Sequence, residues 1–414
     1  MLGNRHHAVK FGGLALAAAL FSARPGLGAE PVTAGEVTGG VPWLFCAGCL
    51  VLLMPAGLGL LATGLTRAKN ASHTAFLTFF GCAIAVLGVW LGDFVWGNAF
   101  APFFWRAAVA CVVVCIPIGA LAERWSLKNF EVTAGIMAAV LFPLLALWTW
   151  GGGWLARLGF EDAAGAGVVH AAGGLVALAG AAVLGPRIGR YNKDGALVPI
   201  PAHNVPLALF GTLLLTAGWL AFNTGRAPAN AHAIGAVTIL AGASGAVVAA
   251  TFMTFTTTKP DPTITMNGWL AGLVASSAGF VRPAAGLAVG AVAGLLVCVV
   301  IRLLDKRRID DPVGVIAVHG VGGLCGVLAG GTHFGAQALG AGVLVAVAGG
   351  GAWIFFKLID KILPMRVAPE VELEGLDVSE TGVVGYPEFQ RTGPYGGGFS
   401  AVAPRRPAPR MVNA

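Results

Sequence analysis

Charged side chains are scarce in this chain. Asp, Glu, Lys and Arg make up 11% of its 414 residues, whereas 57% of the residues are hydrophobic. A soluble domain carries about 25% charged residues, so most of the surface of this protein cannot face water. The composition excludes an ordinary soluble enzyme, a disordered chain and a nucleic-acid-binding protein. We therefore expect an integral membrane protein that is not an enzyme.

The chain also lacks a residue cluster suited to a metal or a cofactor. Cys46 and Cys49 have the spacing of a redox pair, but they lie within an apolar helical pattern. All seven cysteines lie inside apolar runs and are typical of small buried side chains: Cys46, Cys49, Cys82, Cys111, Cys115, Cys298 and Cys325. We expect neither a metal nor a cofactor.

Long apolar runs fill the region between residues 41 and 363. A helix that crosses the bilayer core needs about 20 apolar residues, and the runs are continuous rather than alternating, which excludes barrel strands. Many glycines fall inside them, and small residues let membrane helices pack closely. We predict an all-α bundle of about eleven spans, near 42–66, 73–96, 104–122, 127–150, 163–185, 203–225, 230–256, 263–281, 283–304, 311–334 and 337–362.

The distribution of charge predicts the orientation. Residues 1–29 have the basic start, short apolar stretch and small residues of a signal peptide, which places the mature start outside the cell. Lys and Arg then concentrate in the loops that would lie inside. We expect a multi-pass protein of the cell inner (plasma) membrane, with the N-terminus outside and residues 364–414 as a polar cytoplasmic tail.

A short repeated motif links the fifth and tenth spans. Val169–Leu175 and Val318–Leu324 both read Val-His-x-x-Gly-Gly-Leu, and the two spans cross the membrane in opposite directions. This pattern predicts a five-plus-five inverted repeat with one long helix left over at the C-terminal end. Such repeats usually place their site near the bilayer midplane.

His170 and His319 lie at equivalent points of that repeat, well inside apolar spans. An ionisable residue inside a membrane is a functional hypothesis by default, and the alternative is a packed histidine satisfied by a neighbouring carbonyl. A metal needs more ligands than two histidines, and haem needs a large cavity. A neutral imidazole pair supplies one donor and one acceptor, which suits passage of a small polar molecule or a proton.

Three other residues are candidates near the same helices, each with two interpretations. Asp162 lies eight residues before His170, about 12 Å along a helix, and either caps the span or sets a negative field at the outer mouth of a pore. Trp150 is either an interfacial belt residue or a wall that binds a cation. Phe222 is either core packing or part of a stack in the pore.

From Pro42 to Phe389 the chain resembles the Amt side of the ammonium transporter (Amt/Mep/Rh) family. The resemblance rests on many short motifs in order: Arg67–Asn70, Gly119–Arg124, Trp150–Gly153, Asp162 followed by Val168–His170, Pro201–Pro206, Gly218–Trp219, Phe222–Asn223, Lys259–Pro260, Asn267–Gly268, Asp310–Pro312, Val318–Gly320, and Glu374–Asp377 with Ser379 and Glu380 in the tail.

The resemblance implies a homotrimer with a narrow pore through each subunit. His170 and His319 would be the paired pore histidines, and Phe222 the inner phenylalanine of the gate. Trp150 and Asp162 would form the outer site where ammonium is recruited and deprotonated before ammonia passes the histidines. A PII-type signalling protein would be a plausible partner at the cytoplasmic face.

Three positions depart from the family pattern, and we predict all three at the outer vestibule. Val109 stands where the outer gate has phenylalanine, Arg226 where a serine contacts the cation, and Leu61–Gly64 lacks a tyrosine. At about 6 Å and an effective dielectric near 20, Arg226 would repel ammonium by about 3 kcal/mol. The alternative is that Arg226 reaches the headgroups or pairs with Glu161, Asp162 or Asp93.

Three functions therefore remain open. The first is transport of ammonium or ammonia. The second is an ammonium-binding sensor with weak or no conduction, which would signal through its tail. The third is a conduit for another small neutral molecule.

Overall fold

The computed structural model describes residues 41–97 and 101–387, so the predicted signal peptide lies outside the described residues. The described chain is all-helical, with isolated bridges but no strand. Its helices are α2 (Val41–Val51), α3 (Leu53–Leu65), η1 (Ala68–Asn70), α4 (Ala71–Trp96), α5 (Phe103–Leu121), α6 (Leu127–Ile136), η2 (Met137–Leu141), α7 (Phe142–Thr149), α8 (Trp154–Arg157), η3 (Ala166–Ala171), α9 (Ala172–Leu184), α10 (Val205–Thr224), η4 (Pro228–Asn230), α11 (Ala231–Thr257), α12 (Pro262–Ser276), α13 (Pro283–Lys306), η5 (Ile316–Val321), α14 (Gly322–Ala329), α15 (Phe334–Leu344), η6 (Val345–Gly350), α16 (Gly351–Ile359), α17 (Pro369–Glu374) and η7 (Asp377–Thr381).

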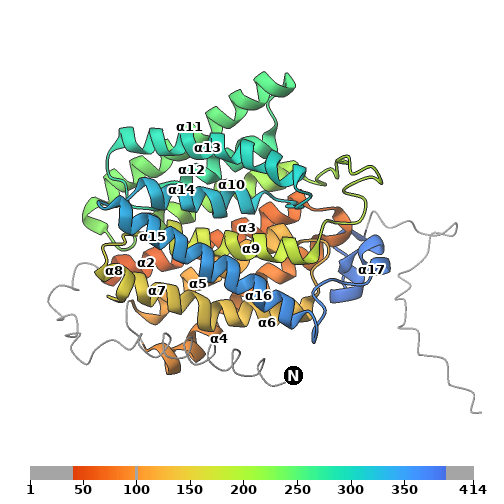
Figure 1. Ribbon diagram of the computed structural model, residues 1–414, viewed down its shortest axis with the longest axis horizontal. Coiled ribbons are helices and arrows are strands. Elements are labelled where there is room, and N and C mark those ends of the chain that lie inside the picture. The colour runs from red at the N-terminus through yellow and green to blue at the C-terminus, as the bar shows by residue number, and fades with distance from the viewer. Residues whose placement is uncertain (1–40, 98–100, 388–414) are drawn as a thin grey trace, which may run out of the picture.

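Each of the eleven predicted spans corresponds to a helix or to a run of consecutive helical segments. Within the described ranges, nine of these are long and apolar enough to cross a membrane. The other two, Pro262–Ser276 and Ile316–Ala329, are shorter. The long helices run side by side along the longest dimension of the molecule (Figure 1). The membrane-protein fold class predicted from hydropathy is confirmed.

Two spans begin later than their apolar runs predict, and for the same reason. Gly165 and Gly314 have φ of +117° and +88°, a backbone conformation that interrupts a right-handed helix and that side chains disfavour. η3 starts directly after Gly165 and η5 two residues after Gly314. The break is therefore repeated in both halves of the chain, just before each histidine.

A proline disturbs the fourth span. Pro143 has no N–H to donate to the carbonyl of Ala139, four residues earlier. The indole of Trp96, at the end of α4, donates to that carbonyl at 2.8 Å. The π-helical segment η2 ends two residues before the proline, so the helix continues through a local change of pitch.

Reciprocal contacts join the two halves of the repeat. A Cβ atom added at Gly174 would overlap the backbone of Gly320, and one added at Gly323 would lie 2.6 Å from the backbone N of Ala171. In each case the residue four positions after one histidine meets the residue that follows the other histidine. A two-fold axis generates contacts of this kind. Glycine at 174 and 323 lets α9 and the η5–α14 helix approach closely.

α8 and α17 mark opposite ends of the long dimension (Figure 1). We call the end with α8 the pocket end and the end with α17 the tail end. At the tail end, Arg187 joins two fully buried carboxylates, because its side chain contacts Glu123 at 2.5 Å and Asp310 at 2.7 Å. Arg67 pairs with the same glutamate. Loops that follow four different spans are thereby held together.

The described part of the tail is docked onto this ion cluster. Glu372 is buried, pairs with Arg366 at 2.8 Å and accepts the backbone N–H of Ile188 at 2.6 Å. Asp377 accepts the N–H of His73 at the start of α4 at 2.8 Å. The segment from α17 to η7 therefore packs against its own subunit.

Candidate functional site

The two predicted histidines are side by side at the centre of the bundle. His170 and His319 are at most 1% exposed, their Nδ1 atoms lie 3.2 Å apart, and their rings are stacked at 28° with centroids 5.2 Å apart. Each lies in a π-helical segment, η3 or η5. Such segments often occur at functional sites.

The hydrogen bond between the rings determines what the outer nitrogens can do. One Nδ1 carries the shared hydrogen, so that ring has a bare Nε2, whereas the other ring carries its hydrogen on Nε2. Neither Nε2 atom has a hydrogen-bond partner among the described residues, although both are buried. A buried polar atom without a partner is rare and costly. The pair thus presents one free acceptor and one free donor.

Aromatic rings enclose the pair. Trp219 of α10 stacks against His170 with centroids 4.6 Å apart and lies 6.1 Å from His319. Its indole N–H donates to Ser277 at 2.9 Å, which fixes the ring. Phe222, one turn further along α10, meets His170 at 5.4 Å and 65°. The next residue, Asn223, lines a pocket, so the Phe222–His170 contact lies close to that pocket along α10.

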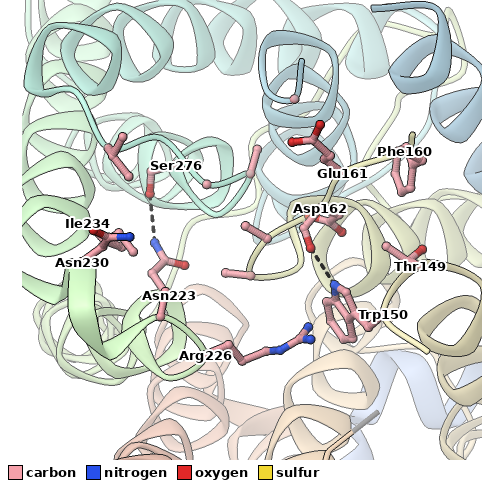
Figure 2. A pocket seen from close by; sticks show the side chains of 17 residues that line it. Thr149, Trp150, Phe160, Glu161, Asp162, Asn223, Arg226, Asn230, Ile234 and Ser276 are labelled. Carbon is pink, nitrogen blue, oxygen red and sulfur yellow. Dashed lines mark hydrogen bonds between the residues drawn. The ribbon is translucent and has the colours of Figure 1, made fainter. Parts of the chain in front are cut away.

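A pocket of about 480 Å³ opens at the pocket end (Figure 2). Trp150, Glu161, Asp162 and Arg226 are among the residues that line it. The Trp150 indole donates to the backbone carbonyl of Asp162 at 2.6 Å, so the ring has a fixed position. The Trp150 and Asp162 predicted for recruitment are therefore in direct contact.

Asp162 caps the start of η3. Its carboxylate accepts N–H groups of Gly165, Gly167 and Val168 at 2.8–3.2 Å. Burial raises the pKa of this carboxyl group to about 6, although the backbone hydrogen bonds oppose the rise. Both oxygens thus accept backbone N–H groups, and Asp162 lines the pocket as well as capping η3.

Asp311 repeats this arrangement and was missed by the sequence reasoning. It accepts the N–H groups of Gly314, Val315 and Ile316 at 2.7–3.2 Å. It precedes His319 by eight residues, as Asp162 precedes His170. That shared spacing was the signal that could have found it. Trp219 was missed as a contact of the histidines because only its tertiary position reveals the stacking.

Arg226 follows α10 and extends across the pocket toward Trp150 (Figure 2). Its guanidinium carbon lies 5.0 Å from the centroid of the Trp150 ring. Among the described residues, no carboxylate lies within ion-pair distance of Arg226. The expected pairing with Glu161, Asp162 or Asp93 is therefore not observed, because Asp93 pairs with Arg106 and Glu161 bonds Thr332.

The other two departures from the family pattern do not line the pocket. Val109 is buried in α5 and is absent from the pocket wall. Leu61–Gly64 lies near the end of α3, where a Cβ atom at Gly64 would meet the backbone of Asn204 and Ala208. This end of α3 is at the tail end of the molecule, because His203, the neighbour of Asn204, forms a hydrogen bond with Tyr386 of the tail. The prediction that all three positions share the outer vestibule is wrong: the first span enters at the pocket end and leaves at the tail end.

Burial alone does not distinguish the pair. His73 in α4 is 1% exposed, and neither of its ring nitrogens has a partner. What distinguishes His170 and His319 is their mutual hydrogen bond.

Comparisons with known proteins agree with this geometry. A sequence model described as the Ammonium Transporter Family matches residues 93–386. The ammonium transporter Amt2 of Archaeoglobus fulgidus is 34% identical, over 84% of this chain and 88% of the relative. Among solved structures, a sensor Amt protein is 33% identical with a TM-score of 0.78, covering 82% of this chain and 97% of that one. Mep2 of Candida albicans is 27% identical with a TM-score of 0.71, covering 79% and 86%.

Proposed function

This chain belongs to the ammonium transporter family, and from that premise we propose that it moves ammonia across the membrane past His170 and His319. The family supports ammonium transport in general terms, and the finer mechanism is our proposal. The observation that carries it is the hydrogen-bonded histidine pair with two unpartnered Nε2 atoms. Ammonia has both hydrogens to donate and a lone pair to accept with, so it matches one free acceptor and one free donor.

The charge of ammonium must be removed before this point. An ion in an apolar interior without a partner costs many kcal/mol, and we propose that Phe222, which contacts the His170 ring, forms part of the barrier that the ion itself does not cross. An ammonium ion in the pocket would therefore release a proton there, and neutral ammonia would continue past the rings.

The histidine pair also offers a route for the proton. A bare Nε2 takes the proton that ammonium gives up, and the shared Nδ1 hydrogen shifts across 3.2 Å to the other ring. That ring then releases its Nε2 hydrogen on the far side. One proton enters and one leaves. Each ring then has the opposite tautomer, and the hydrogens must return to their original nitrogens before the next transfer.

Currents in proteoliposomes test this role. We expect His170→Ala or His319→Ala to abolish the ammonium-induced current or to change its ratio to ammonia flux, because an apolar wall cannot relay protons. His73→Ala is the matched control, since it removes a histidine equally buried and unpartnered but outside the pair. An unchanged current in both single variants would contradict the relay.

A second candidate is an ammonium-binding sensor with weak or no conduction. The contact of Arg226 with the Trp150 ring favours the sensor, since this arginine alters the place where a transporter would recruit the cation. The similar solved sensor Amt protein gives a precedent for that role in this fold. Ammonium binding without isotope uptake would favour the sensor.

The remaining proposals concern assembly and placement. We propose that the chain forms a homotrimer in the inner (plasma) membrane, with the pocket end outside and the tail in the cytoplasm. We also propose that the tail couples the subunits and binds a PII-type signalling protein, and its docking beside the Glu123–Arg187–Asp310 cluster supports this. The substrate is ammonium or ammonia, and no nucleic acid is involved.

A further inference from the structure

The outer pocket already holds a positive charge on its aromatic wall. The Arg226 guanidinium carbon lies 5.0 Å from the centroid of the Trp150 ring, within the range of about 6 Å in which a cation is attracted to an aromatic face. The ring itself is fixed by its bond to the Asp162 carbonyl. A guanidinium at this place makes the contact that a recruited cation would make.

The backbone presents Arg226 in this direction. The indole of Trp43 donates to the carbonyl of Thr224 at 3.2 Å. A Cβ atom at Gly225 would overlap the ring of Trp105, so the backbone of Gly225 packs directly against that indole. Two tryptophans from α2 and α5 therefore hold the segment from which Arg226 projects.

No described carboxylate forms an ion pair with this guanidinium, although the charge of Asp162 attracts it from a longer distance. Both oxygens of Asp162 accept backbone N–H groups, and Glu161 is held by Thr332 on the other side of the pocket. The charge of Arg226 is thus not cancelled at ion-pair distance, and its electrostatic effect on an incoming cation persists.

We infer that Arg226 is a specificity-determining residue, a tethered cation that occupies the Trp150 site so that the pocket admits mainly neutral ammonia, while the little ammonium that still enters supplies the proton for the histidine relay. The inference rests on the proposed transport function. For two unit charges about 5 Å apart at an effective dielectric of 20–40, repulsion reduces ammonium occupancy by about ten- to hundredfold or more. Ammonia, being uncharged, is not repelled.

Initial uptake into proteoliposomes at fixed total ammonium and varied external pH tests the inference, with protein-free liposomes as background. Below the pKa of ammonium, the ammonia concentration rises about tenfold per pH unit, and we expect uptake by the native protein to follow it. Arg226→Ser should give uptake that varies little with pH and half-saturates at ten- to hundredfold lower ammonium. Added guanidinium ion should inhibit only this variant, since only there is the place of the Arg226 guanidinium beside the Trp150 ring left open.

Two controls separate the tethered cation from a general charge effect. Arg226→Lys keeps a cation beside the ring and should behave as the native protein does. Arg157→Ser removes a positive charge from the same end, where its side chain bonds only the carbonyl of Gly152 among the described residues, and should also leave the pH profile unchanged. A native protein with a flat pH profile and inhibition by guanidinium would overturn the inference while leaving transport intact.

Equilibrium binding decides the case in which no variant transports. Calorimetric titration of the detergent-solubilised full chain with ammonium chloride requires no conduction. Tighter binding by ten- to hundredfold in Arg226→Ser supports the tethered cation even if the transport proposal fails. Equal affinity of the native protein and Arg226→Ser overturns it.

Discussion

The helix crossing at Gly174 is the most sensitive test of the histidine geometry. An alanine here would place its Cβ atom inside the contact distance of the Gly320 backbone and 2.8 Å from the carbonyl carbon of His319. Comfortable carbon contacts are about 3.5–4.0 Å. The obstruction is backbone and not the flexible end of a side chain, so the two helices must separate by about 1 Å.

That separation has two consequences. Overpacking a well-packed core costs about 1–3 kcal/mol, and the rigid backbone contact puts Gly174→Ala at the upper end of that range. The Nδ1–Nδ1 distance of 3.2 Å between His170 and His319 would lengthen to about 4 Å, beyond the reach of a hydrogen bond. The variant should therefore lose both stability and the proton relay.

Thermal unfolding in detergent and proteoliposome current measure the two losses. A cost of about 3 kcal/mol corresponds to a fall in Tm of about 6–12 °C for a domain of more than 150 residues. Gly342→Ala in α15 is the matched control, because nothing lies within 4 Å of the added Cβ atom, and alanine favours a helix by up to about 1 kcal/mol. A Tm and a current equal to those of the native protein in Gly174→Ala would refute the close crossing.

Two further predictions concern Asp162, which caps η3, and the docked tail. Asp162 binds its proton in the folded state below about pH 6, while its unfolded pKa is near 3.9, so this residue stabilises the fold increasingly as pH falls from about 6 to 4. The Tm of the native protein minus that of Asp162→Asn should rise over that interval, and a constant difference would contradict the raised pKa. Truncation after Leu363 removes the docked tail and should alter flux or abolish binding of a PII-type protein, whereas deleting only residues 388–414 should change neither. If the longer truncation leaves both unchanged, the tail does not couple to the pore.

Much of the fold was predictable because the controlling physics is local. Continuous apolar runs must become helices in lipid, where every backbone group needs an internal partner. The repeated Val-His-x-x-Gly-Gly-Leu motif predicted, from the sequence alone, the inverted repeat whose two halves meet at these residues. The late starts of η3 and η5 were not predicted, because hydropathy carries no information about the positive φ of Gly165 and Gly314.

The tail-end ion cluster was also beyond the sequence. Glu123, Arg187 and Asp310 lie in three separate loops, and nothing in their spacing says that they meet. From the sequence, Arg187 is only one of the basic loop residues that predict the orientation in the membrane. In the folded protein it is almost completely buried, and such a charge persists only because two carboxylates surround it.

The sequence by itself determined that this is a helical membrane protein of about eleven spans, with a repeated histidine motif and an unusual arginine after the sixth span. Composition, hydropathy and motif spacing determine those features, since each depends on residues close together in the chain. Only the tertiary structure decided that the histidines share an Nδ1–Nδ1 bond, that Trp219 stacks on them, and that Arg226 extends to Trp150 and not to a carboxylate. Those outcomes depend on which groups already have partners when distant helices pack together, and a linear pattern does not encode that.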